Sequence, residues 1–133
     1  MTLRPLPFVV LNGDYAVCRL PCDVSIPDWA IAGQLVSITR TPDELSIVCQ
    51  QAVVPAGVQC ERDWRCLRVA GSMPFSEIGV LASLTVPLAD SGIGVFAIST
   101  FDTDYLFVKS DHFENAISAL QAAGHVIRGN IEA

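Results

Sequence analysis

Two stretches of sequence decide the fold: LVSITRTPDELSIV at residues 35–48 and VFAISTFDTDYLFV at residues 95–108, sixty positions apart. Each reads as an apolar strand, a small hydroxyl residue, a polar turn, a carboxylate (Glu44 or Asp104) and a second apolar strand. Two similar hairpins within 133 residues predict a duplicated small module. Chance similarity between unrelated hairpins is the alternative.

The second hairpin is preceded by a predicted strand and a predicted helix. Residues 64–69 read as the strand. Ser76 is a candidate N-cap for the helix, whose apolar residues recur on one face. Pro87 must kink the helix or end it early, because its ring clashes with the carbonyl four residues back. Gly92 or Gly94 is expected to stop it.

A second helix and a last strand follow the hairpin. Asp111 and Glu114 form a capping-box pattern ahead of apolar residues at helical spacing. Gly124 takes the expected C′ position, and residues 125–128 read as a strand. From Trp64 onward the order is therefore β-α-β-β-α-β, the ferredoxin-like plan.

The first half carries a reduced version of the same plan. Residues 8–11 and 15–20 read as two strands joined by a turn at 12–14, which predicts a β-hairpin. Two prolines leave room for only a short helix around residues 28–30. The hairpin at 35–48 completes this half.

We therefore expect an α+β protein with two ferredoxin-like modules packed together, each an antiparallel sheet with helices on one face. The trimmed first module is placed at 1–63 and the second at 64–133. Hydrophobic residues make up 51% of the chain and charged residues only 17%, against roughly 25% charged in average proteins. Apolar surface is thus expected to be buried between the halves or in a homodimer.

Charge and hydropathy exclude several classes of partner. The net charge is −6 and the eight basic residues are scattered, which argues against nucleic-acid binding. No apolar stretch approaches the roughly 18 residues of a membrane span, and the N-terminus lacks a signal-peptide pattern. We expect a cytoplasmic protein without a membrane partner.

The five cysteines favour a structural interpretation. No CxxC pair occurs, and His112 and His125 lie far from every cysteine in sequence, so a zinc site is not indicated. We expect buried reduced thiols that behave as small hydrophobic residues, with no metal and no cofactor. The cysteines are Cys18, Cys22, Cys49, Cys60 and Cys66.

Three separated segments resemble one known family. They read TRTPDELSIVC at 39–49, FSEIGVL at 75–81 and ISTFDTDY at 98–105. Over about residues 8–127 the chain resembles small bacterial tandem ACT-domain proteins, related to the ACT regions of aspartate kinase and to the CASTOR arginine sensor. The resemblance implies tandem ACT modules that bind an amino acid at the interface between modules.

The resemblance also implies which residues meet the ligand. A glycine-containing loop before a helix faces a β-hairpin, and a strand from across the interface supplies backbone contacts. The first hairpin lacks the Thr-Phe pair that the second hairpin contains, so a second, equivalent site there is doubtful. When the family's ligand contacts are carried over to this sequence, the implied ligand-binding residues are Ser37, Ile38, Ile78, Gly79, Val80, Thr100, Phe101 and Asp104.

These residues suit an amino acid on chemical grounds, and each has a structural alternative. Helix N–H groups can hold the ligand's carboxylate, and Gly79 would let it approach closely. Asp104 can accept from an ammonium or guanidinium group, and Phe101 can cover an apolar part. Alternatively, Gly79 relieves crowding, Asp104 closes its own turn, and Phe101 belongs to the core.

No catalytic motif appears in the sequence. GxSxG, P-loop, HExxH and dinucleotide fingerprints are absent. We therefore predict a non-enzymatic regulatory protein that binds an amino acid or a similar metabolite. The alternative is a dimerising interaction module that has lost its ligand and docks on an enzyme or regulator.

Overall fold

The computed structural model describes residues 5–70 and 78–131, which divide into two compact units. The larger unit takes the chain up to Asn12 and from Arg65 onward, and the smaller unit takes Gly13–Trp64. The described elements, in chain order, are β1 (Pro7–Leu20), η1 (Asp28–Ile31), β2 (Ser37–Arg40), β3 (Leu45–Gln50), η2 (Gln51–Val53), β4 (Cys60–Val69), α1 (Val80–Asp90), β5 (Val95–Ser99), β6 (Asp104–Lys109), η3 (Ser110–His112), α2 (Phe113–Ala122) and β7 (Val126–Ile131).

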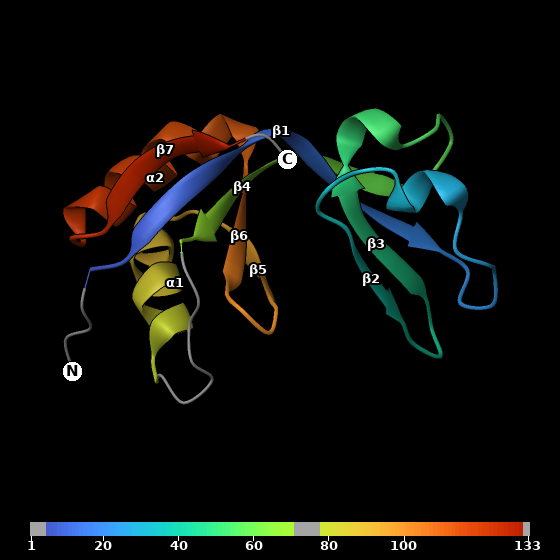
Figure 1. Cartoon of the computed structure of the whole chain (residues 1–133), viewed down its shortest axis with the longest axis horizontal. Helices are drawn as coiled ribbons and strands as arrows, with labels where there is room; N and C mark the ends of the chain where they lie inside the picture. Colours follow the sequence, from blue (N-terminus) through green and yellow to red (C-terminus); the bar gives the residue numbers. More distant parts are fainter. Residues whose placement is uncertain (1–4, 71–77, 132–133) are drawn as a thin grey trace. The chain divides into compact units, whose positions relative to one another are not determined.

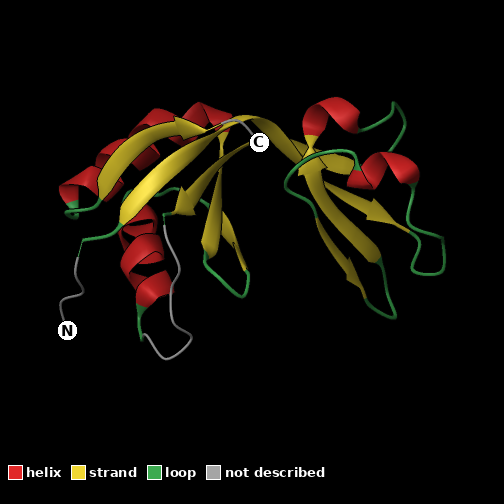
Figure 2. Ribbon diagram, viewed as in Figure 1, coloured by secondary structure: helices red, strands yellow, loops and turns green. Residues whose placement is uncertain are grey.

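The element order confirms the predicted fold class. From β4 onward the chain runs β4-α1-β5-β6-α2-β7, the predicted βαββαβ order. Figures 1 and 2 show both helices of the larger unit on the same side of its strands. The protein is therefore α+β, with ferredoxin-like architecture in its larger unit.

The larger unit contains one strand more than the predicted four. Its strand order is β7-β1-β4-β6-β5, so the first half of β1 lies between β7 and β4. β1 runs parallel to β7, with Phe8 opposite Ile127, and Ala70 N–H donates to Pro7 O at 2.9 Å on its other side. Residues 5–12, which the sequence assigns to the first module, thus complete the sheet of the larger unit.

The predicted β-hairpin at residues 8–20 is wrong. β1 continues through Gly13 as a single strand, and the chain passes from the larger to the smaller unit between Asn12 and Gly13. Gly13 has a φ of +84°, so the sequence correctly marks a residue that needs glycine. Residues 7–11 pair with β7 instead of folding back on residues 15–20, because pairing with distant strands overrides the local turn preference.

One apolar core fills the space between the larger unit's sheet and its helices. Both helices contribute to it, and α1 contacts α2, so they cover the same face. A side chain of this kind typically contributes about 1.5–3 kcal/mol on burial. The buried members are Leu6, Phe8, Val10, Leu67, Val69, Val80, Leu84, Leu88, Ile93, Leu106, Val108, Ala116 and Leu120.

The C-terminal ends of α1 and α2 confirm the prediction that a glycine stops each helix. Gly92 has a φ of +74° and Gly124 a φ of +97°. The N–H groups of Ile93 and His125, which follow these glycines, donate to the carbonyls of Leu88 and Leu120. This is the Schellman arrangement, in which only the glycine position requires a left-handed backbone.

The predicted capping box of the second helix is wrong. A 3₁₀ turn covers Asp111, and α2 begins only at Phe113. His112 is the N-cap residue and makes no side-chain capping bond. Ser76 lies outside the described residues, and α1 begins at Val80 with Gly79 as its N-cap, three residues later than the predicted N-cap.

His125 allows α1 to continue past Pro87 to Asp90. Proline has no N–H, so the carbonyl of Ser83 lacks the donor that residue 87 would normally supply. The Nε2 atom of buried His125 lies 3.0 Å from that carbonyl and must donate to it. Its Nδ1 accepts from the N–H of Leu6 at 3.1 Å, which fixes the neutral tautomer with the proton on Nε2.

The smaller unit is a sheet with 3₁₀ turns. Its strand order is β2-β3-β1-β4, and β3 runs antiparallel to both neighbours that its register records, β1 and β2. The predicted short helix is present as η1, whose Ala30 is fully buried. The buried core of this unit contains Ala16, Cys18, Ala30, Leu45, Ile47 and Cys49.

The two hairpins are equivalent at a spacing of fifty-nine residues, not sixty. Thr41 N–H donates to Glu44 O at 2.9 Å, and Thr100 N–H donates to Thr103 O at 2.8 Å, so both loops are four residues long and begin at these threonines. The position equivalent to Asp104 is therefore Leu45. A shift of one residue turns a strand's side chains to its other face, so the sixty-residue match aligns non-equivalent faces.

The buried Cys18 thiol is expected to make the folded protein less stable at alkaline pH. Burial, then the charges of Cys49 and Cys60, raises the pKa of the Cys18 thiol from 9.0 to about 12. The unfolded thiol ionises first, so the stability from Cys18 is complete below pH 9 and is lost as pH rises towards 12. In urea unfolding of reduced protein, Cys18→Ala should flatten this decline, whereas Cys22→Ala should leave it unchanged. Equal slopes in all three proteins would contradict this assignment.

Candidate functional site

The structure brings six of the eight predicted site residues to one end of the larger unit. Figure 1 shows the start of α1 and the β5–β6 turn at the same end of that unit. Residues 78–80 lead into α1, and residues 100–104 form the turn and the start of β6. Ser37 and Ile38 lie on β2, in the smaller unit.

The start of α1 offers backbone donors. Gly79 is its N-cap, with φ +80° and ψ 10°, and it supplies no side-chain cap. The carbonyl of Gly79 accepts the first helical bond, from Ser83 N–H at 3.0 Å. The N–H groups of the first three helical residues consequently have no acceptor within the helix. No acidic residue lies in that turn, so its positive end has no carboxylate of its own there.

The β5–β6 turn is closed by its two threonines. The hydroxyl of Thr100 donates to Thr103 O at 3.1 Å and accepts from Thr103 N–H at 3.3 Å. The Thr103 hydroxyl is buried and donates to Val69 O at 2.8 Å, at the end of β4. Because the chain leaves β4 there on its way to α1, this bond fixes the turn beside the strand that leads into the helix.

Asp104 is held by the opposite strand. Ser99 and Asp104 face each other across β5 and β6, and the Ser99 hydroxyl donates to Asp104 Oδ1 at 2.6 Å. The carboxylate is partly exposed. It is therefore oriented by Ser99 at the mouth of the turn, where a cationic group could reach it.

Two large apolar side chains at this end are exposed. Phe101 is 80% exposed and Ile78 is 76% exposed. The interpretation of Phe101 as a core residue is therefore wrong. Val80, by contrast, is buried in the core of the larger unit, so only its backbone could meet a ligand.

Ser37 and Ile38 lie on an edge strand. β2 ends the strand order and pairs with β3, with Ser37 opposite Val48 and Ile38 opposite Ile47. The Ile38 side chain packs against the core of the smaller unit. These two residues could offer a ligand the outer backbone edge of β2, and their contact with a ligand stays a prediction.

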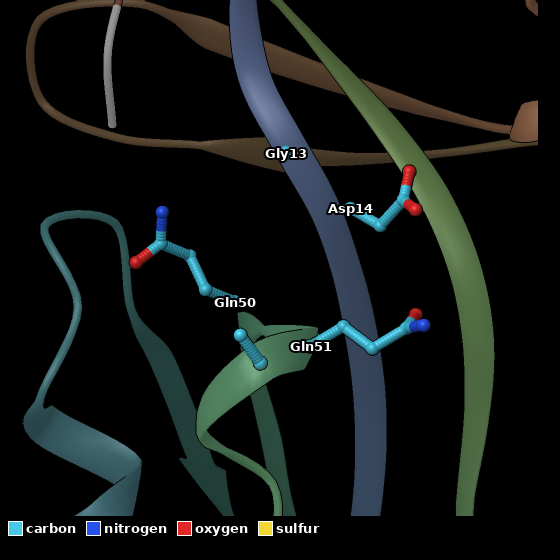
Figure 3. Close-up of a pocket in the computed structure, with 5 residues that line it drawn as sticks. Gly13, Asp14, Gln50 and Gln51 are labelled. Carbon is cyan, nitrogen blue, oxygen red and sulfur yellow. The ribbon is translucent and has the colours of Figure 1, made fainter.

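The smaller unit contains a shallow hollow that the sequence did not predict. It has a volume of about 320 Å³ and is lined by Gly13, Asp14, Gln50, Gln51 and Ala52. Figure 3 shows Gln50 extending to one side, and Asp14 and Gln51 to the other. The Gln51 amide exchanges hydrogen bonds with Asp63 at 2.6 and 3.0 Å. The only sequence signal for this hollow is the polar Gln50-Gln51 pair at the end of a strand.

The histidines and cysteines take structural positions. His125 is buried and bonded at both ring nitrogens, and exposed His112 is the N-cap of α2. All five cysteines are free thiols. Across residues 5–70 and 78–131, no three His, Cys, Asp or Glu side chains are grouped to hold a metal ion.

Replacement of Gly79 by alanine is expected to lower the free energy of unfolding by about 1–2 kcal/mol, because a β-carbon is strained in the left-handed conformation. Gly94→Ala is the matched control, since its added β-carbon meets open space and its φ is not positive. Urea unfolding of the two variants measures the difference. An equal effect of both substitutions would contradict the assigned conformation.

The comparisons with known proteins agree with this architecture. A family model for the ACT domain matches residues 59–122, which span β4 to α2, and a second model, for an N-terminal domain, matches residues 13–57. A crystallised protein from Agobacterium tumefaciens is 41% identical, with a TM-score of 0.90 over 96% of this chain and 95% of that one. The chain contains an ACT domain, over residues 59–122.

Two further relatives of this ACT protein carry regulatory names. The human cytosolic arginine sensor for mTORC1, subunit 1, is 37% identical over 59 residues, which cover 44% of this chain and 18% of the sensor. The regulatory subunit of aspartate kinase from Thermus thermophilus has a TM-score of 0.61 at 11% identity, over 86% of this chain and 94% of that one. The second likeness is one of fold.

The family resemblance predicted from the sequence is thereby confirmed. The match covers less than a fifth of the arginine sensor's length. None of the helices in the described parts of the chain is long and apolar enough to cross a bilayer.

Proposed function

We propose that this ACT protein is a non-enzymatic sensor that binds an amino acid at an interface between ACT modules. The observation that carries the proposal is the start of α1, where the N-cap residue Gly79 supplies no side-chain cap, at the same end of the unit as the turn that presents Asp104. Named relatives include an arginine sensor and a regulatory subunit of aspartate kinase.

Each group of an amino acid has a proposed partner. The N–H groups at the start of α1, next to Gly79, bind the carboxylate. Asp104 accepts from the ammonium or from a cationic side chain, and Ile78 and exposed Phe101 cover apolar parts. A neighbouring module contributes the backbone of a strand such as Ser37–Ile38. A homodimer would supply such a module in the cytoplasm, where free amino acids are available.

A thermal-shift screen of the proteinogenic amino acids tests the proposal. We expect at least one amino acid at millimolar concentration to raise the melting temperature, because a ligand that binds only the folded state stabilises it. Asp104→Asn keeps an acceptor for Ser99 but removes the charge, and it should abolish the shift. Asp102→Asn, on the exposed turn, is the matched control and should retain it. No shift with any amino acid would remove the proposal.

Exposed Phe101 and Ile78 favour a second candidate function, a dimerising module that docks on an enzyme or regulator without a ligand. Light scattering combined with the same screen separates the two. A dimer that responds to no amino acid supports docking, and a strict monomer at micromolar concentration opposes it.

A further inference from the structure

Three thiols meet in the core of the smaller unit. Cys18 on β1 and Cys49 on β3 are fully buried, and half-buried Cys60 at the start of β4 packs against the same core. The three strands are neighbours in the order β3-β1-β4, so Cys18 lies on the central strand of the three. This cluster has no part in the proposed amino-acid site.

The strand register places Cys18 directly opposite Cys60. Arg19 N–H donates to Gln59 O at 2.9 Å, a bond that flanks the antiparallel pair formed by the two cysteines. Opposed residues of this non-hydrogen-bonded kind have Cα atoms about 4.5 Å apart. A disulfide spans Cα separations of about 4.4–6.8 Å, so this pair lies within its range.

The register places Cys49 diagonally from Cys18. Cys18 is opposite Ile47, and Cys49 is opposite Ala16, two positions further along. Diagonal neighbours across a sheet lie about 7–8 Å apart. That separation exceeds the range of a disulfide, so contact between Cys18 and Cys49 does not allow a bond without movement of the backbone.

We propose that Cys18 and Cys60 are a modification site, which forms a reversible disulfide between β1 and β4 when the protein meets a peroxide, while Cys49 remains a thiol. The bond would close the loop from residue 18 to residue 60, and it would stabilise the smaller unit by restricting the unfolded chain. This redox response is independent of amino-acid binding.

The reaction proceeds in two balanced steps. The sulfur of Cys60 attacks one oxygen of hydrogen peroxide, the O–O bond breaks, and Cys60 becomes a sulfenic acid as one water leaves. The sulfur of Cys18 then attacks the Cys60 sulfur, the S–O bond breaks, and the released hydroxide takes the Cys18 proton as a second water. Two thiols lose two electrons, and the peroxide gains them. A reduced low-molecular-weight thiol reverses the bond by exchange.

Exposure assigns the two roles. Cys60 is the partly exposed residue of the pair and Cys18 is fully buried, so we assign the reaction with peroxide to Cys60. Burial raises the pKa of the Cys18 thiol to about 12. Cys18 therefore stays protonated and unreactive until an oxidised sulfur forms beside it.

Thiol counting on the full-length protein tests the site. Reduced protein is exposed to hydrogen peroxide, quenched with catalase and alkylated in denaturant, and its mass is measured. We expect the free thiols to fall from the five of the sequence to three, and dithiothreitol to restore all five. Oxidation should also raise the melting temperature. Five remaining thiols, or sulfinic acid without a crosslink, would overturn the proposal.

Cys49 and Cys60 fall on one tryptic peptide, residues 41–62, so a crosslinked peptide does not show which of the two is bonded to Cys18. Single-cysteine variants identify that partner. Cys60→Ser should abolish the loss of thiols, whereas Cys49→Ser and Cys22→Ser should still lose two. Loss of the crosslink in Cys49→Ser but not in Cys60→Ser would overturn the register argument. Since Cys60 is not fully buried, its serine variant keeps the test valid even if Cys18→Ser does not fold.

Discussion

Replacement of His125 by alanine is expected to lower the free energy of unfolding by about 3 kcal/mol. The substitution removes the acceptor for Leu6 N–H and the donor to Ser83 O in a buried place. Each buried polar group left unsatisfied costs about 1–3 kcal/mol. Urea unfolding measures the loss, and exposed His112→Ala is the matched control, with an expected change within about 0.5 kcal/mol.

A double variant tests the reason for this effect. In Pro87→Ala the new N–H of residue 87 can donate to Ser83 O and replace the bond from His125. His125→Ala should therefore cost about 1 kcal/mol less in the Pro87→Ala background than in the wild type. An identical cost in both backgrounds would show that the histidine does not compensate for the proline.

Phe8→Ala is expected to destabilise the larger unit by about 4 kcal/mol, as for other fully buried phenylalanines. Phe8 has no exposed surface, and its ring meets the His125 ring edge-on at 5.7 Å between centroids. Val9→Ala is the matched control, since Val9 lies on the opposite face of β1 and is only half-buried. Urea unfolding, with hydrogen exchange at the amides of α1 and α2, locates the loss.

The same packing predicts that residues 64–133 do not fold alone. That fragment keeps the ferredoxin-like order but lacks Leu6, Phe8 and Val10 of the core and the strand between β7 and β4. We expect its circular dichroism to show little ordered structure. A stable fold of this fragment with cooperative unfolding would contradict the central place of β1.

Local chemistry made much of the fold predictable. Gly92 and Gly124 end helices because each takes a left-handed conformation after an apolar face, a requirement that reads directly from sequence. Both hairpins were predicted for the same reason, since polar turns separate β-rich runs. The partner of residues 7–11 could not be predicted, because β7 lies more than a hundred residues away.

Six of the predicted site residues lie at one end of the larger unit, but the sequence did not predict every detail of their conformation. An N-cap at Ser76 would place Gly79 inside the helix, whereas the family resemblance implies a loop before it; in the structure Gly79 is the left-handed N-cap of α1. Phe101 was correctly placed in the turn, but exposure is a property of packing and does not follow from residue type. Almost nothing in the sequence predicts the hollow beside Gln50.

Correct register explains why the hairpins differ chemically. At a spacing of fifty-nine, Thr41 repeats the turn-closing role of Thr100, since both hydroxyls accept from a backbone N–H three residues later. The counterpart of Asp104 is then Leu45, which is fully buried. A carboxylate at that position would be buried in the core, so the first hairpin retains the turn and has no equivalent acceptor.

The insertion of β1 has a consequence for synthesis on the ribosome. Residues 7–11 emerge long before their partner β7, which ends at Ile131, so this apolar segment must wait until nearly the whole described chain has been translated. The smaller unit, contained in Gly13–Trp64, can form in the meantime. Contacts so distant in sequence slow folding and prolong the exposure of unpaired strands. Nascent chains stalled before residue 126 should therefore engage chaperones through their N-terminal strand.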